Sequence, residues 1–249
     1  VGVRDKGSRF QLVNGTAAPR SLGPTDISPA AIAGNGKLAG PLRFAGYGIT
    51  APEASWDDLR GLDLKGAVAV VLRGVPDGVF KGGAARSYSD LRYKAWNLRE
   101  HGAQAVAFVD LATDGVPKLV LDGPEGGAGL PVVFVSRTLL RDLVKPAAAA
   151  SPSPAQAAPP AADSFAAIQT AAKQGEPAKL VLSGTLRGEL TLVRESRRER
   201  NVVGRLPADR ADAPVVVLGA HYDHLGLGGR GSFAPDAKVA HPGADDNAS

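Results

Sequence analysis

Residues 214–229 read PVVVLGAHYDHLGLGG, and residues 241–249 read HPGADDNAS. Pro214 interrupts whatever precedes it, and the β-branched run at 215–218 is typical of a strand buried on both faces, as in a parallel sheet. The run leads through two small residues directly into HYDH at 221–224. Open α/β sheets place their sites at the carboxyl ends of such strands. The stretch therefore predicts an α/β sheet with a polar site at the end of this strand.

The carboxylates that could complete such a site follow in the second stretch. Asp245 and Asp246 come after His221 across a glycine-rich loop. A His-x-Asp-His run alone could be a surface turn, and an Asp-Asp-Asn run alone could cap a helix. Taken together and in this order, imidazole followed by distant carboxylates is the ligand set that suits zinc and similar ions.

The two stretches resemble the zinc-binding core of the co-catalytic di-zinc aminopeptidases. This family contains the aminopeptidase Y and bacterial leucyl aminopeptidase relatives as well as glutamate carboxypeptidases. The resemblance implies that His221 and Asp245 are metal ligands, with Asp245 bridging two zinc ions. It implies that Asp223 acts in catalysis from outside the ligand set, by orienting the imidazole of His221. Asp246 would follow Asp245 through a cis peptide bond.

Other positions of the same motifs are not ligands in that family. His224 and His241 lie within the two stretches, and we expect them to shape loops or line a pocket. A third motif, NVVGRLP at residues 201–207, resembles the strand that precedes the metal strand. The resemblance also requires a glutamate general base, a glutamate ligand, an aspartate and a histidine later in the sequence. We therefore expect a chain truncated at both ends, with the general base outside it and no activity of its own.

A second resemblance covers about a hundred residues upstream. The segments FAGYGI (44–49), DLKGAVAVVLRG (63–74), HGAQAVAFVD (101–110) and LPVVFVS (130–136) resemble a protease-associated domain, a module often inserted in these peptidases. Apolar residues at helical spacing predict a helix over 88–101, which Gly102 ends. Ser136 is expected to cap a helix over 137–144. The aspartates at 57, 58 and 63 are expected to lie in solvated turns. A generic small α/β domain is the alternative.

The remaining segments complete the predicted organisation. The fold class is α/β, with an incomplete zinc-exopeptidase sheet domain carrying an inserted, β-rich protease-associated domain. Residues 1–38 are assigned to a remnant of the catalytic domain or a lead-in segment, with a strand at 10–13 and one helical turn near 28–31. The protease-associated domain covers 39–145, a Pro/Ala-rich linker 146–162, and the first part of the peptidase domain 163–249. That last part is expected to open with a helix to about residue 173 and a hairpin of strands 179–182 and 188–193.

Composition excludes several other classes of protein. The net charge is +4, from 29 Lys and Arg against 25 Asp and Glu, and aromatic residues make up only 5%, so no nucleic-acid partner is predicted. No apolar run is long enough for a transmembrane segment. With 0 Cys, disulfides and thiolate metal sites are excluded.

The expected function is that of a zinc-dependent exopeptidase. We expect an aminopeptidase with two zinc ions and a peptide or protein substrate, and the resemblance favours a secreted or periplasmic location. The first alternative is a non-catalytic protease-associated binding module. A receptor-like relative without a working metal centre, or a different di-metal hydrolase, are the others.

Overall fold

The structure is a computed structural model that describes residues 2–117, 119, 127–144, 166, 168, 170–171, 176–195, 200–207, 209–210, 212, 214–221 and 239–240. The chain divides into two units, Val1–Ser196 and Arg197–Ser249. Regular secondary structure in the described residues lies in the first unit.

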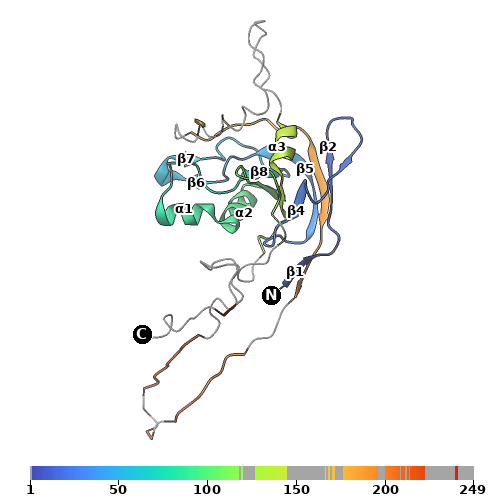
Figure 1. Cartoon of the computed structure of the whole chain (residues 1–249). Coiled ribbons are helices and arrows are strands. Elements are labelled where there is room, and N and C mark those ends of the chain that lie inside the picture. Colours follow the sequence, from blue (N-terminus) through green and yellow to red (C-terminus); the bar gives the residue numbers. More distant parts are fainter. Residues whose placement is uncertain are drawn as a thin grey trace. The chain divides into compact units, whose positions relative to one another are not determined.

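A mixed eight-stranded sheet forms the body of the first unit (Figure 1). The strand order is β3-β2-β11-β5-β8-β9-β10-β4, in which β5, β8, β9 and β10 are parallel neighbours and the other pairs are antiparallel. Two short ribbons, β1 with β12 and β6 with β7, stand outside it. The strands are β1 (Gly2–Asp5), β2 (Arg9–Val13), β3 (Arg20–Ser21), β4 (Ile27–Pro29), β5 (Gly36–Phe44), β6 (Thr50–Ala51), β7 (Trp56–Asp57), β8 (Val68–Leu72), β9 (Ala105–Val109), β10 (Val132–Val135), β11 (Thr185–Leu190) and β12 (Leu192–Glu195).

The sequence patterns explain which strands are central. Every residue of β8 and β9 is buried, as expected for parallel strands covered on both faces. β2 and β5 alternate between exposed and buried residues, as expected for strands with one face in the core. The predicted α/β class is therefore confirmed in this unit. The strand expected at 10–13 is present as β2, and β8, β9 and β10 lie within the segments 63–74, 101–110 and 130–136 that resemble a protease-associated domain.

Helices cover both faces of the parallel strands. Val70 of β8 lines a hollow beneath α3 (Arg137–Leu143). The next residue, Val71, lies instead beside Leu98 of α2 (Leu91–Glu100), where both face Gly48. Because successive residues of a strand point to opposite faces, α2 and α3 pack on opposite sides of the sheet. The other helices are α1 (Gly82–Ser89) and the 3-10 turn η1 (Pro52–Ala54).

Local signals set the helix ends. The Asp90 carboxylate accepts hydrogen bonds from the backbone N–H groups of Arg92 and Tyr93 and so begins α2. Gly102, at φ +91°, follows its last turn. Ser136 caps α3 by accepting from Leu139 N, as predicted. The helix predicted over 88–101 is broken at Asp90, whose extended backbone separates α1 from α2.

Three local predictions are wrong. The strands after residue 178 do not form a hairpin: β11 lies between β2 and β5, and β12 pairs with β1. In this central position β11 has hydrogen-bonding partners on both edges, whereas a hairpin would leave one edge unpaired. Residues 179–182 form no strand, although Leu182 makes an isolated bridge with Val144. The helical turn expected near 28–31 is replaced by β4, which pairs with β10.

The sheet joins segments from both sides of the predicted linker. β2 pairs with β11 and β5 pairs with β11, so residues before 39 and after 162 lie in one sheet. Ile168, which is helical, is also buried in the main core, but residues 163–165 and 172–173 of the predicted helix lie outside the described residues. The linker at 146–162 lies outside them as well. Division of the chain at 38, 145 and 162 stays a prediction.

Candidate functional site

His221 is the one motif residue of the predicted zinc site that the structure describes. It lies in irregular, exposed chain. Asp223, His224, His241, Asp245 and Asp246 are outside the described residues. Within the described ranges, no group of three or more His, Cys, Asp or Glu side chains could hold a metal ion. The donor types suit zinc, but their assembly into a site stays a prediction.

The strand predicted at 215–218 is not formed. These residues have no regular secondary structure, and their side chains are 80–95% exposed. The same holds for 201–207, where Val202, Val203 and Leu206 are 87–96% exposed. An apolar β-branched run becomes a buried strand only when other strands pair with its backbone and cover its side chains. None of the described strands pairs with either run.

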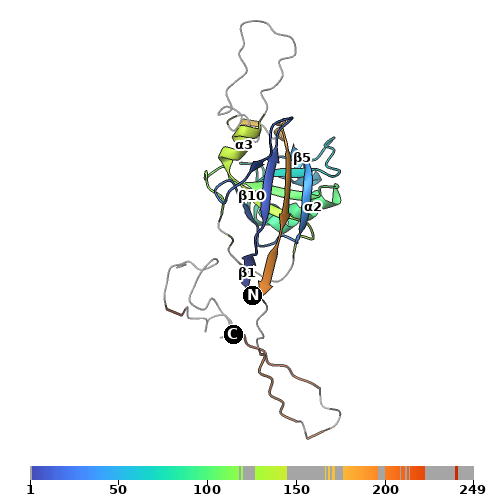
Figure 2. The ribbon, with the colours of Figure 1, turned by 90° about the vertical axis from the view of Figure 1, so that its right-hand side faces the viewer.

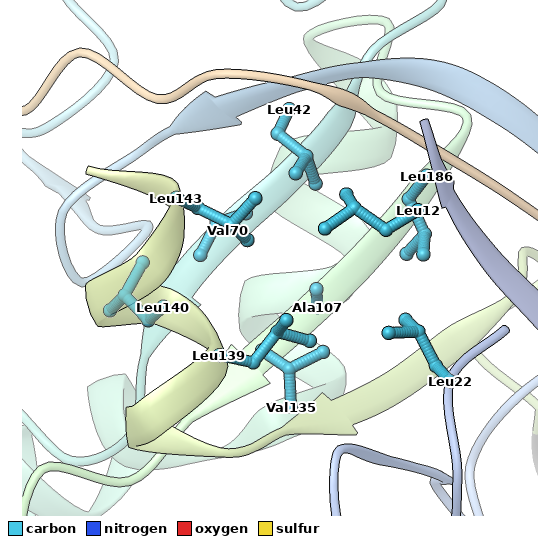
Figure 3. Close-up of a pocket in the computed structure, with 10 residues that line it drawn as sticks. All are labelled: Leu12, Leu22, Leu42, Val70, Ala107, Val135, Leu139, Leu140, Leu143 and Leu186. Atoms are coloured by element: carbon cyan, nitrogen blue, oxygen red, sulfur yellow. The ribbon is translucent and has the colours of Figure 1, made fainter. Parts of the chain in front are cut away.

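The hollow beneath α3 is a gap in the core (Figure 3). All the side chains that line it are apolar, and it leaves only about 10 Å³ for the centre of a water molecule. A buried water needs two to four polar partners, so the gap is dry and too small for a ligand. The lining residues are Leu12, Leu22, Leu42, Val70, Ala107, Val135, Leu139, Leu140, Leu143 and Leu186.

A wider groove of about 460 Å³ runs beside β4. Its polar side chains already have partners within the protein. The Asp5 carboxylate accepts from Gly7 N and from the backbone and side chain of Ser8, and the Ser28 hydroxyl donates to Pro117 O. The groove therefore offers no convergent set of free polar groups of the kind that active sites use.

The most densely built polar cluster lies at the carboxyl ends of β5 and β8. Oδ2 of Asp58 accepts three hydrogen bonds, from Tyr47 N (3.2 Å), Ile49 N (3.0 Å) and Trp56 Nε1 (2.9 Å). Oδ1 is buried and has no hydrogen-bond partner. It faces Gly46, where an added Cβ would lie 2.1 Å from it.

Lys94 completes this cluster from α2. Its side chain is fully buried, and Nζ donates to Leu72 O (2.9 Å) and Gly74 O (2.5 Å) just beyond the end of β8. Nζ also lies 5.5 Å from the centre of the Tyr47 ring, within cation–π range. From the next turn of the helix, Asn97 donates to Gly48 O (3.1 Å). Together these contacts fasten the turn after β5 to α2.

Comparison with protein-family models gives two matches. Residues 29–143 match the PA domain, and residues 201–249 match peptidase family M28. The two matches occur in the order expected for a peptidase with an inserted module. The chain thus contains a segment similar to the PA domain, followed by a segment similar to peptidase family M28. None of the curated proteins compared with the sequence matches it.

Solved structures with some similarity include two aminopeptidases and a peptidase M28 precursor. The aminopeptidase from Aneurinibacillus sp. strain AM-1 is 15% identical (TM-score 0.37; 77% of this chain and 35% of that one). A zinc aminopeptidase from Bacillus subtilis is 19% identical (0.37; 76% and 32%). A peptidase M28 precursor from Shewanella amazonensis is 13% identical (0.39; 78% and 36%). The chain thus spans about a third of the length of these structures.

Burial dominates the electrostatics of the PA-domain cluster. Desolvation raises the pKa of Asp58 from 3.8 to about 6, and the hydrogen bond from Trp56 and the charge of Lys94 oppose this shift. Burial lowers the pKa of Lys94 from 10.5 to about 7, against the attraction of Asp58. Burial also raises the pKa of Tyr47 to about 12.

The sequence patterns do not predict this cluster. The sequence predicts a solvated turn at Asp58, and the structure corrects this: Oδ1 is buried and Oδ2 organises the turn. A signal was present, because Lys94 occupies the buried helix face together with Leu91, Ala95 and Leu98. A lysine on that face needs buried acceptors. The acceptors found are backbone carbonyls, and neither hollow described above is lined by Asp58 or Lys94. The hydrogen bonds of this cluster therefore connect the turn after β5 and the end of β8 to α2.

Proposed function

We propose that this chain is part of a zinc-dependent exopeptidase, and specifically of an aminopeptidase that uses two zinc ions. One observation carries the proposal: the motifs NVVGRLP, GAHYDHLG and HPGADDNAS occur in this order within the M28 match at residues 201–249. The M28 match supports the peptidase class. The metal, the ion count and the direction of cleavage are proposals.

The proposed roles follow the chemistry of the donors. His221 and Asp245 would hold zinc, with Asp245 shared between two ions, and Asp223 would orient the imidazole of His221. Bound zinc polarises a carbonyl and lowers the pKa of a bound water. The general base is not assigned to any residue of this chain, and residues 1–249 alone are proposed not to hydrolyse peptides.

The proposed substrates are peptides or proteins, and no nucleic-acid partner is proposed. A secreted or periplasmic location is proposed from the family resemblance. Among the described residues, no helix has the length and apolar character to cross a membrane.

Two short peptides that differ only in the amino terminus test the proposal. The full-length protein should cleave the peptide with a free amino group and leave the acetylated one intact, because an aminopeptidase requires the free terminus. A third peptide with an amidated carboxyl terminus should be cleaved normally. Cleavage of the acetylated peptide combined with loss of cleavage on amidation would assign carboxypeptidase action instead. No cleavage of any peptide by zinc-loaded protein would refute the peptidase proposal.

A non-catalytic binding module is the second candidate, and one surface feature of the PA domain favours it. Trp96 is 51% exposed and stands at the end of a row of aromatic rings through Tyr93, Tyr88 and Phe80 to the buried Trp56. An exposed tryptophan that packs against other aromatic rings is typical of interface hot spots. Capture of a protein ligand by the wild-type chain but not by Trp96→Ala, in a protein that fails every peptide assay, would favour this candidate.

A further inference from the structure

The two ends of the first unit meet in a ribbon beside the main sheet. β1 and β12 pair antiparallel, from Gly2 with Glu195 to Asp5 with Leu192 (Figure 2). The ribbon has only these two strands. A two-stranded ribbon is marginally stable by itself, so other contacts must attach it to the body.

Asn35 supplies the first of these contacts. The β11–β5 ladder ends at the pair Leu190 and Gly36. Asn35, the residue before β5, continues this ladder with its side chain. Its Nδ2 donates to Leu192 O (2.9 Å), and its Oδ1 accepts from Leu192 N (2.7 Å). The carboxamide thus takes the place of a backbone partner for the first residue of β12.

Arg194 supplies the second contact, from the ribbon back to the body. Its guanidinium donates to Ala31 O (3.1 Å) and Ala33 O (2.7 Å) in the loop between β4 and β5. That loop is itself fixed, because Gly34 N donates to Leu130 O (2.9 Å). The kink between β11 and β12 is held as well: Thr191 N donates to Ser8 Oγ (2.9 Å), and Lys6 N donates to Thr191 O (2.8 Å).

These contacts serve no site described above. They satisfy backbone groups of β12, the last strand of the first unit (Val1–Ser196), which we call the PA unit. Backbone N–H and C=O groups need hydrogen-bond partners, and each such bond contributes about 0.5–1.5 kcal/mol, so these contacts stabilise β12 in its observed position.

We propose that Asn35 and Arg194 are positioning residues that lock β12 onto the PA unit, so that the unit and its exit strand move as one rigid body as far as Glu195. The proposal does not depend on peptidase activity, and it goes beyond the proposed function because it assigns a mechanical role to two residues outside every motif.

Spin-label distance measurements test the lock directly. The chain has 0 Cys, so Val193→Cys on β12 and Glu100→Cys at the end of α2 would carry the only labels. The distance distribution should be narrow with Asn35 and Arg194 present. It should broaden markedly in Asn35→Ala and Arg194→Gln. Arg194→Lys should restore it in part, because an ammonium can still donate to either carbonyl.

Controls separate positioning from general destabilisation. Arg187→Gln changes an exposed arginine on the adjacent strand β11 and should leave the distribution unchanged. Amide exchange of β8 and β9 should stay at the wild-type rate in every variant, while exchange of residues 192–195 accelerates in Asn35→Ala. An unchanged distance distribution in both Asn35→Ala and Arg194→Gln would overturn the proposal. So would equal acceleration of exchange in β8 and β12, which would indicate a loss of global stability instead of a released strand.

Discussion

Replacing Asp58 by alanine and by asparagine should have very different effects on stability. All three hydrogen bonds to this side chain converge on Oδ2, whereas Oδ1 is buried without a partner. Asp58→Ala leaves three donors without their acceptor. Each such donor costs about 1–3 kcal/mol, so we expect a loss of about 3–5 kcal/mol in the free energy of unfolding. Asp58→Asn keeps an oxygen in the Oδ2 position and removes a buried charge, and should cost about 1 kcal/mol.

The same pair of variants predicts a pH dependence. The pKa of Asp58 is raised from 3.8 to about 6 in the folded protein, so the folded state binds this proton more readily than the unfolded state does. The resulting stabilisation is fully present below pH 3.8 and is lost as the pH rises through 6. Relative to Asp58→Asn, the wild type should therefore lose on the order of 3 kcal/mol between about pH 4 and pH 7.

Urea unfolding followed by tryptophan fluorescence and circular dichroism measures both effects. Asp63→Ala is a matched control, because Asp63 accepts a bond only from Lys65 N in an exposed turn, and it should change stability little. Equal losses for Asp58→Ala and Asp58→Asn would refute the assignment of Oδ2 as the organising acceptor. A wild type and Asp58→Asn that follow the same pH profile would refute the buried, proton-binding carboxyl group.

Further predictions concern the neighbours of Asp58. The stability of the wild type relative to Lys94→Met should rise as the pH increases from about 7 to 10.5. Burial lowers the pKa of Lys94, so the unfolded chain holds this proton more tightly than the folded one. The urea midpoints of the two proteins at pH 7 and pH 9 should show this rise, and a difference that stays constant would contradict it. Gly46→Ala should destabilise the protein far more than Gly61→Ala in thermal unfolding. Both glycines have a positive φ. The new Cβ at position 46 would lie 2.1 Å from Asp58 Oδ1, whereas the new Cβ at position 61 would have no atom within 4 Å. Gly61→Ala should cost about 1–2 kcal/mol for its left-handed backbone alone, and equal losses at the two positions would exclude the clash.

Much of the PA domain was predictable because its signals are local. The buried runs of β8, β9 and β10 and the caps of α2 and α3 are each contained in a few consecutive residues. Strand pairing is not local. Nothing in residues 185–190 indicates that β11 lies between β2 and β5, because its partners are about 150 residues or more away in the sequence.

The buried charges were missed for a related reason. Asp58 sits in turn-forming sequence, and its environment depends on the backbone of the turn after β5 and on the charge of Lys94 in α2, neither of which residues 57–58 indicate. In the M28 motifs, by contrast, the residue types are informative although the expected strand does not form. Their residue types identify the family by resemblance, whereas the strand expected at 215–218 requires pairing strands that none of the described residues supply.

Zinc titration of the full-length protein and its variants tests the central functional proposal most directly. Wild-type protein should bind zinc, and His221→Ala and Asp245→Ala should lose that binding. Asp223→Ala should weaken it by about 10- to 100-fold, as expected for a residue that orients a ligand. His224→Ala and His241→Ala should bind as the wild type does. Zinc binding that survives both His221→Ala and Asp245→Ala, or that disappears only with His224→Ala or His241→Ala, would contradict the assignment of the metal site.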